Sequence, residues 1–279
     1  MVDKNGQPIQ WNEPVEGFEF EPDTVVVTAE HQGQKLGACG LDDSPFNGFV
    51  DASFYIGIGI HAGIRSGISA QGNVNMLQSL TQHRPVRLGE PLIVRGHIRK
   101  ITEVPRGITI DTEVVFFGED GKPAISAPRR SLKPDPARVG TTIGTTIGKR
   151  GAGDRPEPVI EDVSALSPFE KYQLTPENIK SYSMEGNSIH YEMEAANKAG
   201  FRAPIIGGGM GVHYLLYTLW QQYSPESFHL SVYFRRPIFW DDLIEVWADT
   251  RDKPWRALCL ARGGKVLTEA KIDELEEKS

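Results

Sequence analysis

The sequence predicts an α+β protein in which one structural unit occurs twice, and two observations support this. First, residues 84–94 (RPVRLGEPLIV) resemble residues 236–246 (RPIFWDDLIEV) with a slip of one residue. Each segment is followed by a strand-like run, a Gly-Lys turn and a final strand-like run. Second, each copy places an apolar segment before its strands. A buried helix beside an antiparallel sheet, repeated twice, is expected from this order.

The second copy carries clear signals for its helices. Thr175 is expected to be an N-cap, with Pro176 at the first helical position. Residues 211–223 (GVHYLLYTLWQQY) are apolar almost all round and predict a buried helix. His213, which lies on it, is expected in the core or the wall of a tunnel rather than in catalysis. Strands are expected at about 228–238, 243–250, 255–262 and 265–272.

In the first copy, strands fit about residues 73–84, 91–104, 107–118 and 122–131. The glycine-spaced run at 56–63 (IGIGIHAG) is the candidate for its central helix, in spite of poor helix propensity. The Gly-, Pro- and Thr-rich stretch between the copies is typical of a linker. We therefore expect an N-terminal unit at 1–133, a linker at 134–158 and a C-terminal unit at 159–279.

Composition limits the classes of function. The chain has 279 residues and a formal net charge of −7, and no Lys/Arg-rich stripe appears, so no nucleic-acid partner is expected. No apolar run approaches the ~20 residues that span a bilayer, and the polar start does not resemble a signal peptide. Cys39 and Cys259 are far apart and lack metal-ligand spacing, so we expect neither a disulfide nor a metal site. A reducing, cytoplasmic location is expected.

The candidate catalytic residues lie in residues 185–190 (EGNSIH) and in the glycine run that follows. Glu185 and His190 place a carboxylate and an imidazole on one turn, where they can transfer protons. Asn187 lies between them as either a substrate contact or a turn residue. Gly208 and Gly209 then open the apolar helix, and bare amides at a helix N-terminus can bind a developing oxyanion. The pattern indicates chemistry at a carbonyl compound.

This stretch resembles the MaoC-like dehydratase or (R)-specific enoyl-CoA hydratase family, which has a hot-dog fold. The family motif is Asp-x-Asn-Pro-aliphatic-His, followed by an Ala-Gly-Phe-type segment and a helix opening with Gly-Met. Here Glu185 replaces the Asp, Ser188 replaces the Pro, and the glycine run before Met210 carries one extra residue. The resemblance covers about 168–275 well and 20–133 more weakly. It implies two tandem hot-dog folds, each an antiparallel sheet wrapped on a central buried helix.

The resemblance also implies an activity: hydration of a 2-enoyl-CoA to a 3-hydroxyacyl-CoA, or the reverse dehydration, without cofactor or metal. Glu185 and His190 would be catalytic, and Asn187, Gly208, Gly209 and Met210 would contact the acyl-CoA substrate. The glycine amide that forms the oxyanion hole stays open between Gly208 and Gly209. A chain with two hot-dog units is compatible with a monomer or a homodimer.

Residues 42–47 (DDSPFN) stand where the first copy should carry the motif. Read against it, Asn47 takes the place of the histidine, and an amide cannot exchange a proton near neutral pH. The second copy is therefore expected to hold the active site. The resemblance to double hot-dog relatives implies that the first copy widens the acyl tunnel for a bulky, branched or otherwise unusual acyl group. A hot-dog thioesterase and a non-catalytic acyl-thioester-binding protein remain the alternatives.

Overall fold

The structure is a computed structural model that describes residues 9–135, 156–183 and 187–277. We call residues 9–135 the N-terminal half and residues 156–277 the C-terminal half. The elements of the N-terminal half are β1 (Asp23–Val26), α1 (Ala29–Ala38), η1 (Ser44–Phe46), α2 (Phe54–Arg65), β2 (Val74–Gln82), β3 (Pro91–Val104), β4 (Gly107–Phe117), β5 (Pro123–Ser126) and β6 (Arg129–Pro134).

The C-terminal half repeats this succession of strand, helices and strands. Its elements are η2 (Val163–Ala165), β7 (Ser167–Gln173), α4 (Pro176–Ser183), η3 (Ser188–His190), α5 (Met193–Lys198), α6 (Gly208–Tyr223), β8 (Pro225–Phe234), β9 (Leu243–Ala248), β10 (Ala257–Arg262) and β11 (Lys265–Glu277).

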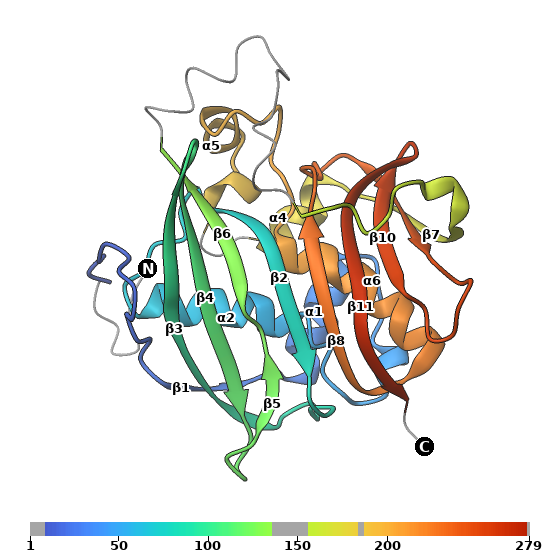
Figure 1. Cartoon of the computed structure of the whole chain (residues 1–279), viewed down its shortest axis with the longest axis horizontal. Helices are drawn as coiled ribbons and strands as arrows, with labels where there is room; N and C mark the ends of the chain where they lie inside the picture. The colour runs from blue at the N-terminus through green and yellow to red at the C-terminus, as the bar shows by residue number, and fades with distance from the viewer. Residues whose placement is uncertain (1–8, 136–155, 184–186, 278–279) are drawn as a thin grey trace.

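One sheet of eleven strands runs through both halves (Figure 1). Its order is β1-β3-β4-β5-β2-β8-β11-β10-β9-β7, with β6 paired to β2 and β4. Read outward from the centre, the two halves have matching strand orders, so the duplication predicted from the sequence is confirmed. The halves join where β2 pairs antiparallel with β8, from Leu77 opposite Tyr233 to Gln82 opposite Phe228. The unit boundaries at 133 and 159 stay predictions, and most of the expected linker lies outside the described residues.

The central helices α2 and α6 lie against one face of the sheet (Figure 1). On α2, Tyr55 packs on Phe116 with ring centroids 4.7 Å apart. A Cβ on Gly59 would lie only 3.3 Å from Val114, so the glycine permits close packing of helix and strand despite its poor helix propensity. The helix α6 is buried on nearly all sides, as its apolar sequence predicts.

Several elements follow the sequence expectation, and others differ for local reasons. Thr175 Oγ1 accepts from Asn178 N at 3.3 Å, and α4 begins at Pro176 as expected. The helix α6 begins at Gly208, so the glycine run opens it as expected and the helix extends beyond the apolar stretch at 211–223. The expected strand at 122–131 is interrupted before β6, where Pro128 lacks a backbone N–H. The helix α1 was not anticipated, because its sequence AEHQGQKLGA is polar and contains two glycines.

The cysteines and surface charges can be placed directly. Cys39 and Cys259 are both buried and free, and burial raises the pKa of the Cys259 thiol to about 12.

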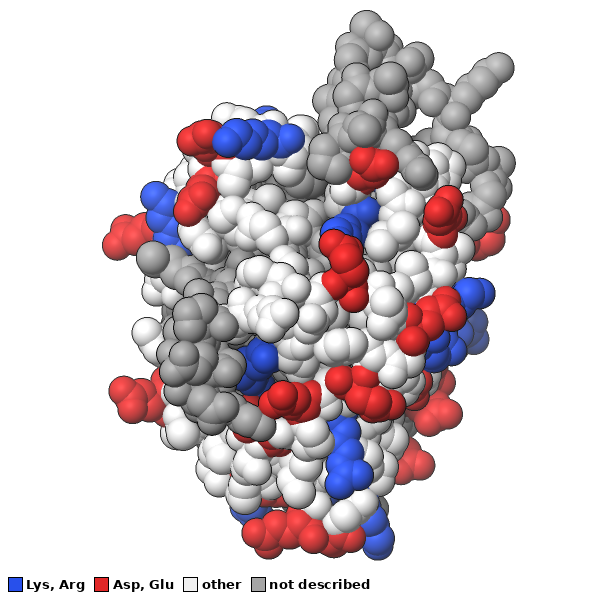
Figure 2. Space-filling model, turned by 90° about the vertical axis from the view of Figure 1, so that its left-hand side faces the viewer, with Lys and Arg blue, Asp and Glu red and all other residues white. Residues whose placement is uncertain are grey.

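Among the described residues, no helix is long and apolar enough to cross a membrane. The same residues contain no cluster of three or more His, Cys, Asp or Glu side chains arranged to hold a metal ion. Figure 2 shows acidic and basic side chains interspersed around a mostly uncharged surface.

Candidate active site

A cavity of about 1760 Å³ lies between the two halves. Elements from both halves line it, including α2 and the starts of β2 and α6. Among its lining residues are Ile56, Asn73, Asn75, Arg129, Asn187, His190, Gly207, Gly208, Gly209, Met210 and Phe234. Five residues expected from the sequence to act on substrate (Asn187, His190, Gly208, Gly209 and Met210) therefore meet in one cavity. Its volume exceeds that of a typical drug-sized site.

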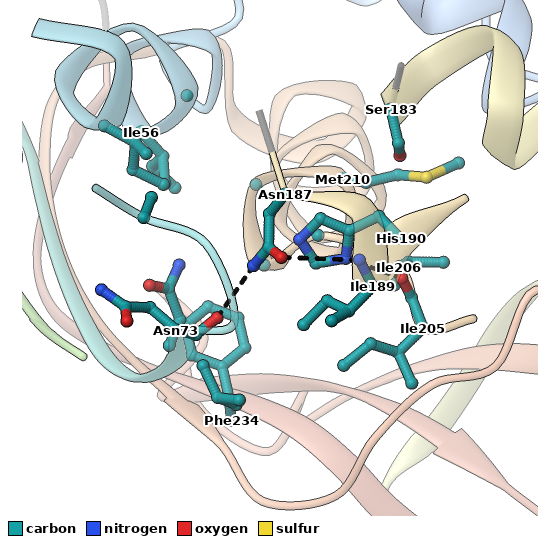
Figure 3. Close-up of a pocket in the computed structure, with 18 of the residues that line it drawn as sticks. Ile56, Asn73, Ser183, Asn187, Ile189, His190, Ile205, Ile206, Met210 and Phe234 are labelled. Carbon is teal, nitrogen blue, oxygen red and sulfur yellow. Dashed lines mark hydrogen bonds between the residues drawn. The ribbon is translucent and has the colours of Figure 1, made fainter. Parts of the chain in front are cut away.

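The short turn η3 carries His190 and is fastened to the N-terminal half through Asn187 (Figure 3). Asn187 Oδ1 accepts from Gly72 N at 3.1 Å, and its Nδ2 donates to Asn73 O at 3.1 Å. Ser188 Oγ accepts from Gln71 Nε2 at 2.7 Å. The Asn187 amide is thus engaged with backbone on both sides. Its geometry favours the reading of a turn residue that positions the histidine.

The hydrogen bond of His190 determines which ring nitrogen faces the cavity. His190 Nδ1 lies 2.8 Å from Ile205 O, and a carbonyl only accepts, so Nδ1 carries the proton. The Nε2 lone pair of the neutral ring is then free, and Nε2 lies 3.9 Å from the position of a Cβ on Gly207. Burial lowers the pKa of His190, opposed by the bond to Ile205. A neutral imidazole with a basic Nε2 therefore faces the N-terminus of α6 at neutral pH.

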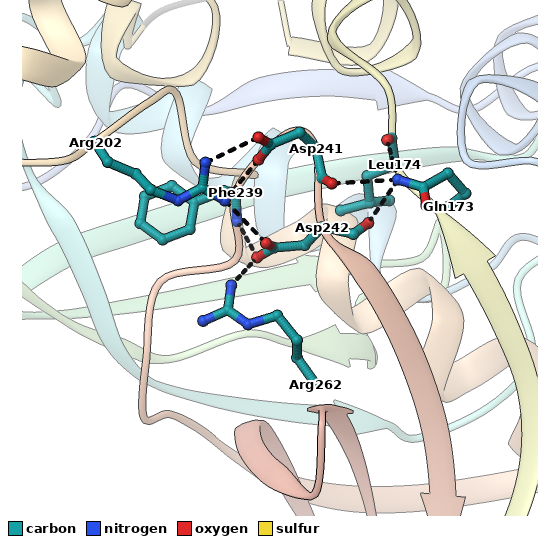
Figure 4. A network of polar contacts seen from close by, with 7 residues as sticks. All are labelled: Gln173, Leu174, Arg202, Phe239, Asp241, Asp242 and Arg262. Atoms are coloured by element: carbon teal, nitrogen blue, oxygen red, sulfur yellow. Dashed lines mark hydrogen bonds and ion pairs between the residues drawn. The ribbon is translucent and has the colours of Figure 1, made fainter.

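A network of charged residues holds the segment that presents the Ile205 carbonyl (Figure 4). Arg202 donates to both Asp241 oxygens, at 2.7 and 2.8 Å, and its guanidinium stacks 4.0 Å from the ring centroid of Phe239. Asp242, which is nearly buried, also accepts from Arg202 and Arg262. These contacts fix residues 202–205 against the loop between β8 and β9. The Ile205 carbonyl, which accepts the hydrogen bond from His190 Nδ1, is therefore held in place by this network.

The first turn of α6 offers backbone donors to the cavity. Its N-cap is Gly207, and no side chain caps the helix there. The N–H groups of Gly208, Gly209 and Met210 have no intrahelical acceptor, and the helix dipole adds partial positive charge at this end. A Cβ on Gly208 would lie 2.8 Å from Phe234 Cζ, so a larger residue here would displace its neighbours. The arrangement can bind an oxyanion beside His190.

Glu185, the expected second catalytic residue, lies outside the described residues. The nearest described residues on either side of it, Ser183 and Asn187, both line the cavity. The role of its carboxylate accordingly stays a prediction.

The sequence reading missed the residues that the N-terminal half contributes to the site. Ile56 lies on α2, 3.8 Å from the position of a Cβ on Gly209. Asn75 on β2 and Arg129 on β6 reach the same cavity. All three are distant from residues 185–210 in sequence and belong to no motif. Only the predicted duplication, which pairs the two units, could have pointed to this half.

The N-terminal half has a counterpart of η3 in η1. When the two turns are matched at their N-caps, Asp43 corresponds to Asn187, and Phe46 rather than Asn47 corresponds to His190. The sequence alignment was therefore shifted by one residue, because it was anchored on Asp42 instead of on the cap. Phe46 is fully buried, and Asn47 is exposed with a φ of 47°. In either register this turn carries no histidine.

Comparisons with known proteins place this geometry in a fold family. No family model matches the sequence, and no curated protein matches it. Among solved structures, HtdX from Mycobacterium tuberculosis is similar with a TM-score of 0.71 at 18% identity, over 91% of this chain and 98% of that chain. A MaoC-like dehydratase from Phytophthora capsici has a TM-score of 0.64 at 17% identity, over 92% and 96%.

A third structure bears on the alternative activity. An acyl-ACP thioesterase from Bacteroides thetaiotaomicron has a TM-score of 0.56 at 12% identity, over 91% of this chain and 96% of that chain. The likeness is thus weaker than that to HtdX and to the dehydratase, although all three extend over most of the chain. The match runs through both halves, with their shared strand order and paired central helices. The chain has the double hot-dog fold of the MaoC-like dehydratases.

Proposed function

We propose that this protein hydrates a 2-enoyl thioester, or catalyses the reverse dehydration, at the cavity that contains His190. The observation that carries the proposal is the aim of His190 Nε2 toward the open N-terminus of α6. A base and an oxyanion-binding site that line one large cavity are the parts that this reaction needs. The similarity of fold to MaoC-like dehydratases supports the same reaction class.

The residues would divide the reaction between them. His190 Nε2 takes a proton from water while the water oxygen bonds to C3 of the enoyl group. The C2–C3 π electrons move toward the thioester carbonyl, whose oxygen is stabilised by an amide of Gly208 or Gly209. A proton then reaches C2 and the carbonyl re-forms, so that one water has been added. Glu185 would orient the water or exchange the second proton, and the acyl carrier would be coenzyme A.

The test is a panel of enoyl-CoA substrates with two readouts. Loss of absorbance of the conjugated thioester reports hydration, and release of free thiol reports thioester hydrolysis. His190→Ala should lower the hydration rate by ~10²–10⁴-fold, the usual contribution of a general acid/base. His97→Ala, a histidine outside the cavity lining, is the control and should match the wild type.

Each contrary outcome has a distinct meaning. Unchanged turnover in a folded His190→Ala variant would refute the site. Thiol release without hydration would establish the thioesterase instead. Binding of acyl-CoA with neither reaction across the panel would indicate an acyl-binding protein.

A further inference from the structure

Arg129 on β6 lines the same cavity and reaches only neutral partners. Its Nη1 donates to Asn75 Oδ1 at 3.3 Å, and its Nε donates to Thr112 Oγ1 at 3.3 Å. Both bonds are long for a charged donor. Two neutral oxygens leave most of the donors of a guanidinium unused.

No described carboxylate neutralises this charge. The neighbouring cations on the sheet, Arg130 and Arg99, both face Asp111, at 2.6 and 3.7 Å, whereas no described carboxylate lies within ion-pair distance of Arg129. Burial lowers the pKa of Arg129 to about 10, which still leaves it protonated at neutral pH. Arg129 is half-buried, and even partial withdrawal of a cation from water is costly unless an anion pairs with it. The cavity therefore presents an uncompensated positive charge to its ligand.

The position of Arg129 relates this charge to the reacting atoms. A guanidinium can only donate, so Asn75 must turn its oxygen toward Arg129 and its Nδ2 away from it. That Nδ2 lies 2.9 Å from the position of a Cβ on Gly208. One asparagine side chain thus separates Arg129 from the first residue of α6. The pantetheine arm separates the phosphates of coenzyme A from the thioester by a much longer span, so an anion on the acyl group fits this place better.

We propose that the substrate is an enoyl thioester whose acyl group carries its own carboxylate, and that Arg129 binds this carboxylate. This inference rests on the proposed function, because it takes the first turn of α6 as the site of the thioester oxygen. The carboxylate would receive the unused guanidinium donors, with Asn75 holding the guanidinium from the side of α6. Binding would give the half-buried cation the anionic partner that the described residues do not supply.

The test compares matched substrates and matched variants. Glutaconyl-CoA and 2-pentenoyl-CoA differ by a terminal carboxylate in place of a methyl group, and fumaryl-CoA and crotonyl-CoA form a shorter pair. In Arg129→Gln, kcat/KM for the carboxylated member of a pair should fall by about 10- to 100-fold, the usual loss for a charged hydrogen bond. The neutral member should be little affected. Arg129→Lys should be intermediate, and Arg99→Gln, which removes an exposed charge outside the cavity lining, should match the wild type.

A second set of substrates distinguishes an acyl carboxylate from a coenzyme A phosphate as the anion that Arg129 binds. The same acyl groups are tested as N-acetylcysteamine thioesters, which lack the phosphates of coenzyme A. The proposal requires the Arg129 effect to persist in this series. An equal loss for all CoA substrates that vanishes in the N-acetylcysteamine series would assign Arg129 to a phosphate and overturn the proposal. A folded Arg129→Gln variant with unchanged selectivity would overturn it as well.

Binding of unreactive ligands distinguishes this inference from the reaction itself. Calorimetry with glutaryl-CoA and valeryl-CoA, which have no double bond, measures recognition of the carboxylate without turnover. The wild type and His190→Ala should both prefer glutaryl-CoA, and Arg129→Gln should lose the preference. If this pattern holds but no enoyl thioester is hydrated, the proposed function fails while the carboxylate site stands. Hydration of enoyl thioesters without a preference for glutaryl-CoA would mean that the proposed function stands while the carboxylate site fails.

Discussion

The N-termini of the two central helices, α2 and α6, occupy corresponding places in the two halves but differ in what surrounds them. At α6, Gly207 leaves the first turn open to the cavity, with His190 Nε2 nearby. At α2, polar side chains fill the space. Asp51 Oδ2 lies 2.6 Å from His213 Nδ1, and Ser53 Oγ donates to Asp51 Oδ1 at 2.7 Å. One helix N-terminus thus contributes to contacts within the core, and the other is the one that we propose as the ligand site.

The two histidines show the same contrast. His213 is fully buried and uses both ring nitrogens, since Nε2 lies 2.8 Å from the Tyr182 hydroxyl. Its contacts link Asp51 of the N-terminal half to two elements of the C-terminal half. In His190, Nδ1 donates to the Ile205 carbonyl, whereas Nε2 faces the cavity. The expected core location of His213 agrees with this burial, and its contacts explain how the second helix is fixed against the first half.

The largest effect should come from disrupting the buried polar cluster of Asp51, Ser53 and His213, which anchors α6 to the N-terminal half. Asp51→Ala removes the buried carboxylate that contacts His213 Nδ1 and accepts from the Ser53 hydroxyl, leaving these two groups only each other, and should lower the free energy of unfolding by about 3–5 kcal/mol. Urea unfolding measures this loss. His213→Ala should cost a similar amount, and the double variant should lose less than the sum because the two residues share one interaction.

The activity of these variants sharpens the comparison between the helices. At temperatures where Asp51→Ala is folded, it should still hydrate substrate, because the open site is at α6. Wild-type stability combined with lost turnover would contradict the assignment of Asp51 and His213 to the anchor.

The next effect should come from partly filling the open end. In Gly208→Ala the new Cβ would lie 2.8 Å from Phe234 and 2.9 Å from Asn75, so that both side chains or the helix must move. A shift of ~1 Å in the site can cost about 100-fold, and kcat/KM should fall by that order. Gly211→Ala is the control, because its Cβ would meet Leu260 at an ordinary 3.5 Å. Equal activities for the two variants would remove the first turn of α6 from the mechanism.

The pH dependence should follow the burial of His190. Its pKa is lowered, so the imidazole stays neutral down to a pH below its ordinary value of roughly 6.5. Because the base must be neutral, kcat/KM should be constant above this value and fall only at lower pH. Burial disfavours the charged form of the His190 ring, so protonation of this ring destabilises the fold. The stabilisation from the neutral, buried ring is therefore present at neutral pH and is lost as the pH falls.

An NMR titration of the ring protons tests this directly. The His190 resonances can be assigned by their absence in His190→Ala, and the titration midpoint should lie below that of a free histidine. A midpoint above about 6.5 would mean that an imidazolium faces the cavity, and it would change the group that activates water.

The sequence reading succeeded where local chemistry decides the structure. Thr175 caps α4 as its residue type predicts, and the uniform apolarity of residues 211–223 shows in the burial of α6. It could not place Arg129 or Asn75, because their partnership arises from the register of β6 on β2. It also assigned Asn47 to the histidine position, because a match by residue type does not reveal that η1 begins at Ser44, one residue earlier than the match implies. Contacts between distant strands carry most of the information that a single sequence lacks.

The smallest effect should come from Asn47, and it tests whether the first half has any catalytic part. Asn47 is exposed, adopts a left-handed conformation, and follows a turn whose last residue is the buried Phe46. Asn47→Ala should lower the free energy of unfolding by about 1 kcal/mol, because a Cβ without a polar side chain disfavours this conformation. Asn47→Gly relieves that strain and should be nearly neutral. Steady-state kinetics should give wild-type kcat/KM for both variants, whereas a loss of turnover in folded Asn47→Gly would mean that this turn still contributes to the reaction.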